Sequence, residues 1–207
     1  YSLARGLSGT NQVSVITGDW GQKKVEFFDE IRVIKSFRLG ARGPIQFLKG
    51  LVVFWKSLTE SDADIYLSSG AGPEVGVIAF FCKLKKKKFI YRTAHLIDCN
   101  GLYVKTNGLS GSIYEYGLHN ASKIVTSVKH HKDILIARYT DFTEKIYHIN
   151  LGIFPHDVVS DKSHVLWVAR CEKWKRPEIF LEIARTLNKV PFIMICPRQK
   201  NDVIYFE

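Results

Sequence analysis

The sequence predicts an α/β fold with a parallel sheet and helices on both of its faces. Short runs rich in β-branched residues alternate with apolar segments of helical length along most of the chain, which is the pattern of βαβ units. Crossovers between parallel strands are right-handed, so the helices can cover both faces. The chain has 207 residues, 46% of them hydrophobic and 24% charged. This composition can bury a core and argues against disorder.

The expected elements follow one another in a regular order. β-branched or alternating runs bounded by turn residues predict strands at 12–18, 30–37, 63–70, 89–97, 123–128 and 145–150. Helical spacing predicts helices at 1–8, from Pro44 onward, and at 73–84, 110–121 and 130–139. The polar segment 19–30 is predicted to be a loop.

A second α/β unit is predicted to begin late in the chain. Residues 1–152 would form an N-terminal Rossmann-like domain, and 153–163, which has a proline and no clear period, suits a linker. A new strand–helix–strand cycle, HVLWVAR, RPEIFLEIARTL and PFIMIC, falls within 164–207. Two strands and one helix cannot bury a sheet face alone, so we expect this second domain to be truncated here.

The charge and the cysteines restrict the possible partners and compartments. A net charge of +10 indicates an anionic partner, which could be nucleic acid, a phosphorylated small molecule or an anionic membrane surface. The four cysteines have no CxxC spacing and suit reduced thiols in a cytoplasmic protein. No apolar run reaches the roughly 18 residues that a membrane-spanning helix needs. The basic turn at 83–88 is either a solvated loop or a contact with anionic lipid headgroups at the inner membrane surface.

Two short motifs invite functional interpretations that their context does not favour. SSGAGPEVG at 68–76 follows a strand and opens a helix, but Gly70, Gly72 and Gly76 have GxGxxxG spacing, whereas the dinucleotide fingerprint is GxGxxG. We interpret these glycines as a tight turn that could still line a cleft. Asp62 and Asp64 form the DxD of metal-dependent nucleotide-sugar enzymes. They fall at the start of a strand, the wrong edge of the sheet for a ligand, which favours a structural role.

The positions of the histidines in the sequence indicate their possible roles. His95 is predicted to end the strand 89–97 at the carboxyl edge of the sheet, where it could donate to a hydroxyl or phosphate or act as an acid or base. A structural polar role is the alternative. His119, His130 and His131 have no partners at metal-ligand spacing, so no metal site is expected.

The segment 168–187 concentrates cations at a strand-to-helix turn. A strand at 165–169 would deliver Arg170 to the sheet edge, the loop carries Lys175, and Pro177 suits the first helical turn. The helix N-terminus adds partial positive charge and N–H donors, while arginine offers a planar fork to phosphate and lysine a point charge. These residues would suit a diphosphate without a metal. Exposed charges in an ordinary loop are the alternative.

These residues give the chain a resemblance to a known family. VLWVARCEKWKRPEIFLEIARTL at 165–187 resembles the segment that opens the second domain of family 4 retaining glycosyltransferases, GT-B enzymes with two facing Rossmann-like domains. That family reads V-G-R, four residues, then K-G before an apolar helix. YSLARGLSGTNQVSVITG, FIYRTAH and ASKIVTSVKHHKDILIARY followed by KIYHINLGI resemble further family segments in the same order. The resemblance therefore covers nearly the whole chain.

The resemblance implies roles for three residues. Arg170 and Lys175 match the arginine and lysine that contact the diphosphate of the donor, and His95 matches the histidine at the end of a strand, the candidate catalytic residue beside the sugar or acceptor. The chain departs from the family at Ala169 and Arg176, where the family has glycines, at Trp174, where it has an acidic residue, and at 150–154, where it tends to read P-N-G-[IV]-D.

The implied function is retaining transfer of a sugar from a UDP- or GDP-sugar to a glycan or lipid-linked acceptor, with no metal and no cofactor. The family's glycine-rich loop would precede Tyr1 and its paired glutamates would follow Glu207, so the chain alone is expected to be inactive. Two alternatives remain open. A non-catalytic protein of the same fold would bind the donor without turnover, and a basic nucleic-acid-binding protein would bind any duplex with steep salt dependence.

Overall fold

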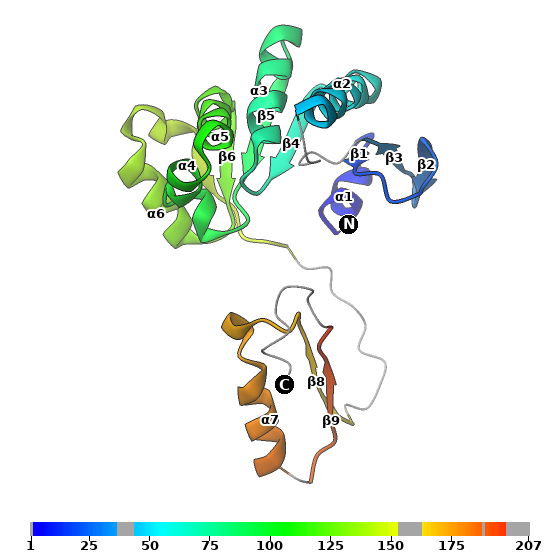
Figure 1. Cartoon of the computed structure of the whole chain (residues 1–207), viewed down its shortest axis with the longest axis vertical. Coiled ribbons are helices and arrows are strands. Elements are labelled where there is room, and N and C mark those ends of the chain that lie inside the picture. The colour runs from blue at the N-terminus through cyan, green and yellow to red at the C-terminus, as the bar shows by residue number, and fades with distance from the viewer. Residues whose placement is uncertain (1, 37–43, 153–162, 188, 198–207) are drawn as a thin grey trace. The chain divides into compact units, whose positions relative to one another are not determined.

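The structure is a computed structural model that describes residues 2–36, 44–152, 163–187 and 189–197 (Figure 1). Contacts between backbone segments divide the chain into two compact units, residues 1–154 and 155–207. The predicted linker, 153–163, lies outside the described residues except for Ser163. Each unit is described by itself.

The first unit begins with a helix and a small mixed sheet. Helix α1 (Ser2–Ser8) precedes strands β1 (Ser14–Thr17), β2 (Val25–Phe28) and β3 (Ile31–Lys35), which are ordered β1-β3-β2. β1 pairs with β3 in parallel, as expected, whereas β2 is antiparallel to β3.

The prediction of a loop throughout 19–30 is wrong, because β2 lies within it. Asp29 and Glu30 join β2 to β3 and both have positive φ, 46° and 63°, the backbone of a tight two-residue hairpin turn. Asn and Gly are the usual residues there, and an Asp-Glu pair gives no such signal in the sequence. Phe27 and Phe28 are also largely exposed, so the strand lacks the apolar alternation that marks a half-buried one.

The second sheet of this unit contains the parallel α/β pattern that the sequence predicts. Strands β4 (Ile65–Ser69), β5 (Lys88–Arg92), β6 (Lys123–Thr126) and β7 (Ile146–His148) are neighbours in that order and all parallel. The predicted helices are α2 (Pro44–Ser61), α3 (Pro73–Lys85), α5 (Gly108–Asn120) and α6 (Lys129–Arg138). Three short helical elements were not predicted: η1 (Leu96–Asp98), α4 (Leu102–Thr106) and η2 (Thr140–Lys145).

Two glycines allow the helices over this sheet to pack closely. A Cβ atom on Gly76 of α3 would lie 2.1 Å from the carbonyl oxygen of Ile113, and one on Gly117 of α5 would lie 2.8 Å from the backbone nitrogen of Gly76. Only a residue without a side chain fits such a crossing. Beneath the two helices, Phe89, Tyr91 and Ile124 of the sheet are buried. The core of this unit therefore depends on backbone contact between α3 and α5.

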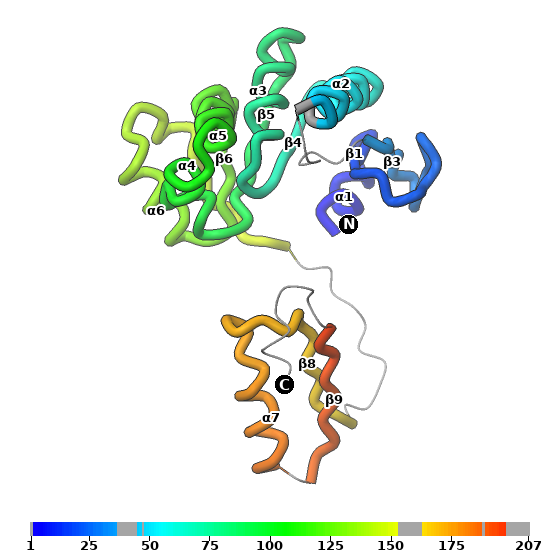
Figure 2. The backbone as a smooth tube through the Cα atoms, viewed as in Figure 1, coloured from blue at the N-terminus to red at the C-terminus, as the bar shows by residue number. Residues whose placement is uncertain are grey.

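The described residues of the second unit form a strand–helix–strand motif (Figure 2). Strands β8 (Val165–Val168) and β9 (Phe192–Ile195) are parallel, and between them lie η3 (Lys173–Lys175) and α7 (Pro177–Thr186). Phe180 of α7 packs on the sheet between Trp167 and Phe192, with ring centroids 6.0 and 5.4 Å away. Among all the described residues of the chain, no helix is both long and apolar enough to cross a membrane.

Candidate functional site

A buried carboxylate organises the carboxyl edge of the parallel sheet in the first unit. The side chain of Asp98 is almost inaccessible and accepts hydrogen bonds from the backbone N–H groups of Ala71 (3.0 Å), Ala94 (2.7 Å) and His95 (2.9 Å). Ala71 follows β4, while Ala94 and His95 follow β5. One side chain thus joins two neighbouring strand-end loops, and nothing in its sequence position indicates this role.

A pair of tyrosines attaches α5 to the same edge. The Tyr114 hydroxyl donates to the carbonyl oxygen of Asp98 at 2.7 Å and lies 2.9 Å from the hydroxyl of Tyr91. Burial raises the pKa of both phenols well above their usual range, so both stay protonated. These hydroxyls act as hydrogen-bonding groups of the core and have no acid–base role near neutral pH.

His95 lies beyond the strand and does not end it. β5 ends at Arg92, and His95 is the N-cap of η1, the short helix that follows. Its Nδ1 atom accepts from the backbone N–H of Ile97 at 3.4 Å, while Asp98 accepts from the backbone N–H of His95. The two residues thus cap each other reciprocally. The imidazole is exposed, so the cap holds the ring at the sheet edge where a ligand could meet it.

A second histidine follows the neighbouring strand at the same edge of the sheet. His131 lies in the first turn of α6, after the next strand. Burial lowers its pKa from the ordinary value of 6.5, with smaller contributions from His130 and His95 in the same direction. The Asp98 carboxylate opposes that shift. Burial therefore favours the neutral ring of His131 near the carboxyl edge of β6. Within the described ranges, no cluster of His, Cys, Asp or Glu could hold a metal ion.

The glycine motif and the DxD motif have structural explanations. Gly70 has a φ of 86° and turns the chain after β4, and Gly76 belongs to the α3–α5 crossing described above. Asp62 and Asp64 lie at the amino end of β4, and the ammonium of Lys87 is 3.5 Å from a carboxylate oxygen of each. The two carboxylates share one lysine of the basic turn, so the structure supplies a partner other than a metal.

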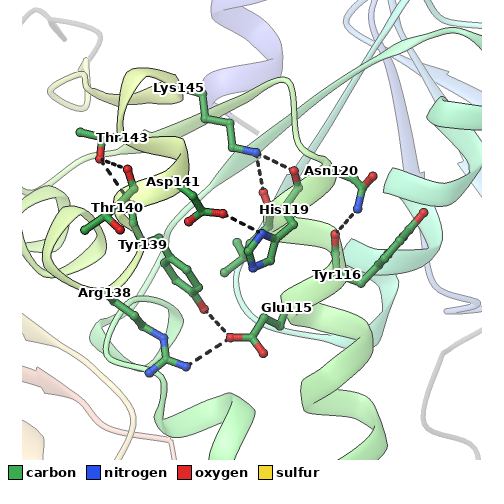
Figure 3. Close-up of polar contacts among 11 residues, drawn as sticks. Glu115, Tyr116, His119, Asn120, Arg138, Tyr139, Thr140, Asp141, Thr143 and Lys145 are labelled. Atoms are coloured by element: carbon green, nitrogen blue, oxygen red, sulfur yellow. Dashed lines mark hydrogen bonds and ion pairs between the residues drawn. The ribbon is translucent and has the colours of Figure 1, made fainter.

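A further polar cluster links α5, α6 and η2 (Figure 3). Glu115 accepts from the hydroxyl of Tyr139 at 2.9 Å and from Arg138 at 3.3 Å. Lys145 donates to the carbonyl oxygens of Leu118 and His119 at 3.2 and 2.7 Å, which are among the last carbonyls of α5. A lysine in this position compensates unpaired carbonyls at a helix end, and burial lowers its pKa. The cluster fastens helices together and presents no obvious ligand site.

Arg170 lies two residues after β8 in the second unit, close to the strand-end position that the sequence predicts. Its guanidinium is half exposed and lies 3.2 Å from a carboxylate oxygen of Glu172, whose side chain is only 15% exposed. The other oxygen of Glu172, Oε2, is buried, and no described group hydrogen-bonds to it. Leaving a buried acceptor unsatisfied costs about 1–3 kcal/mol. The Arg170–Glu172 pair is therefore held in an incompletely satisfied arrangement.

Lys175 lies on the same connection, one turn before α7. Its ammonium is 3.7 Å from the centre of the Trp174 ring, so the tryptophan makes a cation–π contact with the lysine. Arg176, where the family has glycine, adopts a left-handed φ of 54° and caps α7. A glycine would adopt this backbone more easily.

The predicted residues thus fall in two places. Arg170 and Lys175 share the β8–α7 connection of the second unit, and His95 lies at a sheet edge of the first unit. Sequence reasoning assigned no role to Asp98 or Glu172, and it considered His131 only as a possible metal ligand. A carboxylate three residues after His95 was visible, but its donors come from a loop far away in sequence.

Comparison with known proteins gives a likeness of fold only. No family model matches the chain, and no curated protein matches it. Among solved structures, the S. aureus MnaA–UDP co-structure is 9% identical, with a TM-score of 0.51 over 92% of this chain and 62% of that one. UDP-N-acetylglucosamine 2-epimerases from Methanocaldococcus jannaschii and Rickettsia bellii are each 13% identical, with TM-scores of 0.47 and 0.44 over 84% and 81% of this chain.

The likeness confirms the predicted α/β fold of GT-B type, with a parallel sheet and helices on both faces. The chain spans between 48% and 62% of the length of the solved structures it resembles.

Proposed function

We propose that the protein binds a nucleotide-diphosphate sugar and holds the diphosphate on the β8–α7 connection. The observation that carries this proposal is that two exposed cations, Arg170 and Lys175, lie on one connection at the carboxyl end of a parallel strand, directly before a helix. Ligands of open α/β sheets bind at that end, and the N-terminus of a helix favours anions. The UDP in the S. aureus co-structure, a protein of similar fold, supports a nucleotide diphosphate as the ligand.

The two cations would have different tasks. The planar guanidinium of Arg170 can donate two parallel hydrogen bonds to phosphate oxygens, whereas Lys175 supplies a mobile point charge. Arg170 now pairs with Glu172, so a diphosphate would have to displace that carboxylate or share the guanidinium with it. Before the ligand binds, the ion pair with Glu172 holds the Arg170 guanidinium on the β8–α7 connection.

The finer proposal is retaining transfer of the sugar to a glycan or lipid-linked acceptor, in the manner of family 4 glycosyltransferases. When the bond between the sugar and the diphosphate breaks, negative charge grows on the leaving group. Fixed cations stabilise such charge best where they are already in place, at about 3 kcal/mol for one well-aimed donor. His95 would meet the sugar hydroxyls or the acceptor. This chemistry requires no metal, so we expect a chelator to leave donor binding unchanged.

The test is a thermal-shift and calorimetry panel of UDP-, GDP- and ADP-sugars. One class should stabilise the protein, and Arg170→Ala should weaken its affinity about tenfold to a hundredfold, since a hydrogen bond to a charged group contributes about 1.5–3 kcal/mol. Lys175→Ala should weaken it less. Arg185→Ala and Lys189→Ala, exposed cations of the same unit, serve as matched controls and should bind normally.

Two results would contradict the proposal. One is that no nucleotide sugar binds, and the other is that Arg170→Ala and Arg185→Ala bind equally well. Tight, salt-sensitive binding to any duplex without a response to nucleotide sugars would favour the nucleic-acid alternative. Donor binding without transfer to any glycan or lipid acceptor, followed by mass spectrometry, would favour a non-catalytic sensor.

A further inference from the structure

Helices α2 and α3 of the first unit carry neighbouring apolar side chains that face solvent. Ile45, Leu48 and Val52 of α2 are 68%, 61% and 55% exposed, and Phe80 and Leu84 of α3 are 51% and 60% exposed. On each helix these residues recur at spacings of three or four, so they form a stripe along one side. We name these five residues the α2–α3 apolar stripe.

Direct packing joins the two halves of the stripe. The half-buried ring of Trp55 lies between the helices, with its centroid 6.0 Å from that of Phe80 and 5.0 Å from that of Phe81. On α2, Trp55 follows Val52 by three residues and therefore lies on the same side of the helix. The two rows of exposed side chains are thus one surface, and the two helices lie next to each other in Figure 1. Contiguous apolar surface of this kind marks an interaction site more often than scattered single residues do.

Lysines border the stripe. Lys49 and Lys56 project from the exposed side of α2, and Lys85 and Lys86 lie at the end of α3, all exposed. Lys83 instead donates to Asn120 of α5. The nearby carboxylates are held by other cations: Glu60 pairs with Lys24 and Arg32, and Asp62 and Asp64 pair with Lys87. The surface therefore combines an apolar centre with an excess of positive charge at its edge.

We propose that the α2–α3 apolar stripe and its lysines dock the protein on an anionic lipid bilayer. An amphipathic helix lying in the interface buries its apolar side chains at the boundary of the acyl chains while lysines contact the headgroups. A protein partner would match the apolar centre equally well, but the lysine border selects an anionic partner, and a bilayer satisfies both features at once. The proposal does not depend on the nucleotide-sugar site, which lies in the other unit.

Flotation with lipid vesicles tests this proposal. The protein should bind vesicles of phosphatidylcholine with phosphatidylglycerol, and bind vesicles of phosphatidylcholine alone far more weakly. Lys49→Gln with Lys56→Gln should weaken binding about 25-fold, or about fivefold for each lysine. Leu48→Ser with Val52→Ser should weaken it by about tenfold or more, because their apolar burial is lost. All four side chains are exposed, so circular dichroism should show unchanged folding.

Matched controls lie elsewhere on the same unit. Leu109→Ser and Lys129→Gln alter an exposed leucine of α5 and an exposed lysine of α6 and should bind vesicles like the wild type. Arg170→Ala should also bind vesicles normally, so failure of the donor site and failure of the membrane surface can be told apart. Equal binding to both kinds of vesicle, or equal binding by the stripe variants and their controls, would overturn the proposal. So would a dimer in sedimentation experiments that dissociates in the Leu48→Ser, Val52→Ser variant, because a second copy would then occupy the stripe.

Discussion

Two strand-to-helix connections at carboxyl ends of parallel strands have opposite designs. In the first unit, the loop after β5 is built around Asp98, whose buried carboxylate accepts three backbone N–H groups. In the second, the loop after β8 is built around Glu172, which contacts exposed Arg170 with one oxygen and has no hydrogen-bond donor for its other, buried oxygen among the described residues. The first loop uses both oxygens of its carboxylate, although the buried Thr93 hydroxyl in that loop has no hydrogen-bond partner among the described residues. The second loop leaves one carboxylate oxygen of Glu172 without such a donor, next to an exposed guanidinium.

The difference between the two loops indicates which of them is expected to bind a ligand. Buried polar groups in proteins are almost always satisfied, and an exception calls for an explanation such as a ligand. Variants of the first loop should therefore change stability, and variants of the second should change ligand affinity with little effect on stability. Variants of the histidines beside Asp98 should have smaller effects on stability, because these side chains lie on or near the same loop but remain near solvent.

The largest effect is expected for Asp98→Ala. It leaves the N–H groups of Ala71, Ala94 and His95, whose hydrogen bonds to Asp98 are partly buried, without their acceptor. A hydrogen bond to a charged group contributes about 1.5–3 kcal/mol. We expect the free energy of unfolding to fall by about 4 kcal/mol, measured by urea denaturation. Asp98→Asn, which keeps one acceptor oxygen, should lose less.

Asp133→Ala is the matched control, because this aspartate is exposed on α6 and should change stability by less than about 0.5 kcal/mol. If Asp98→Ala were no less stable than Asp133→Ala, the loop after β5 would not be held by its carboxylate, and the contrast between the two loops would fail.

A smaller effect, on ligand affinity and not on stability, is expected for Glu172→Gln. Removing the carboxylate charge releases Arg170 from its ion pair, and half-exposed pairs contribute about 0.2–1 kcal/mol. Affinity for the stabilising nucleotide sugar should therefore rise by up to about fivefold in calorimetry, with little change in stability. Glu182→Gln, an exposed residue of α7, is the control and should leave affinity unchanged. Weaker binding by Glu172→Gln would mean that the carboxylate itself contacts the ligand.

The sequence was sufficient for elements with a strong local signal. The parallel strands β4 to β7 are short β-branched or aromatic runs, and the Arg170 segment was placed correctly at the end of β8, because such patterns reflect burial of the strand itself. It failed where geometry depended on a turn or on distant groups. The Asp29–Glu30 hairpin has no Asn-Gly signal, and β5 stops three residues before His95 because Ala94 and His95 donate to Asp98.

The candidate site was predictable only in part for the same reason. The cations Arg170 and Lys175 could be named because their chemistry and spacing are local. The partners that hold them could not, since the ring stacked on Lys175 and the carboxylate beside Arg170 are ordinary loop residues until the backbone brings them together. The five side chains of the α2–α3 apolar stripe had the spacing of a core face, and only the structure shows that they are exposed.

The smallest expected effect is a dependence of the stability on pH that comes from His131, which lies near the loop that contains Asp98. Burial lowers the pKa of His131 in the folded state below its ordinary value of 6.5, so the unfolded chain binds a proton more readily than the folded one. Stability should be at its full value above that ordinary value and should fall as the pH drops through it toward the lowered pKa. As the pH is lowered across this range, the urea midpoint of His131→Gln should fall less than that of the wild type. The difference should be a fraction of the loss expected for Asp98→Ala. An identical slope in both proteins would show that protonation of His131 is not coupled to the sheet edge, and the acid sensitivity would have to come from carboxylates elsewhere.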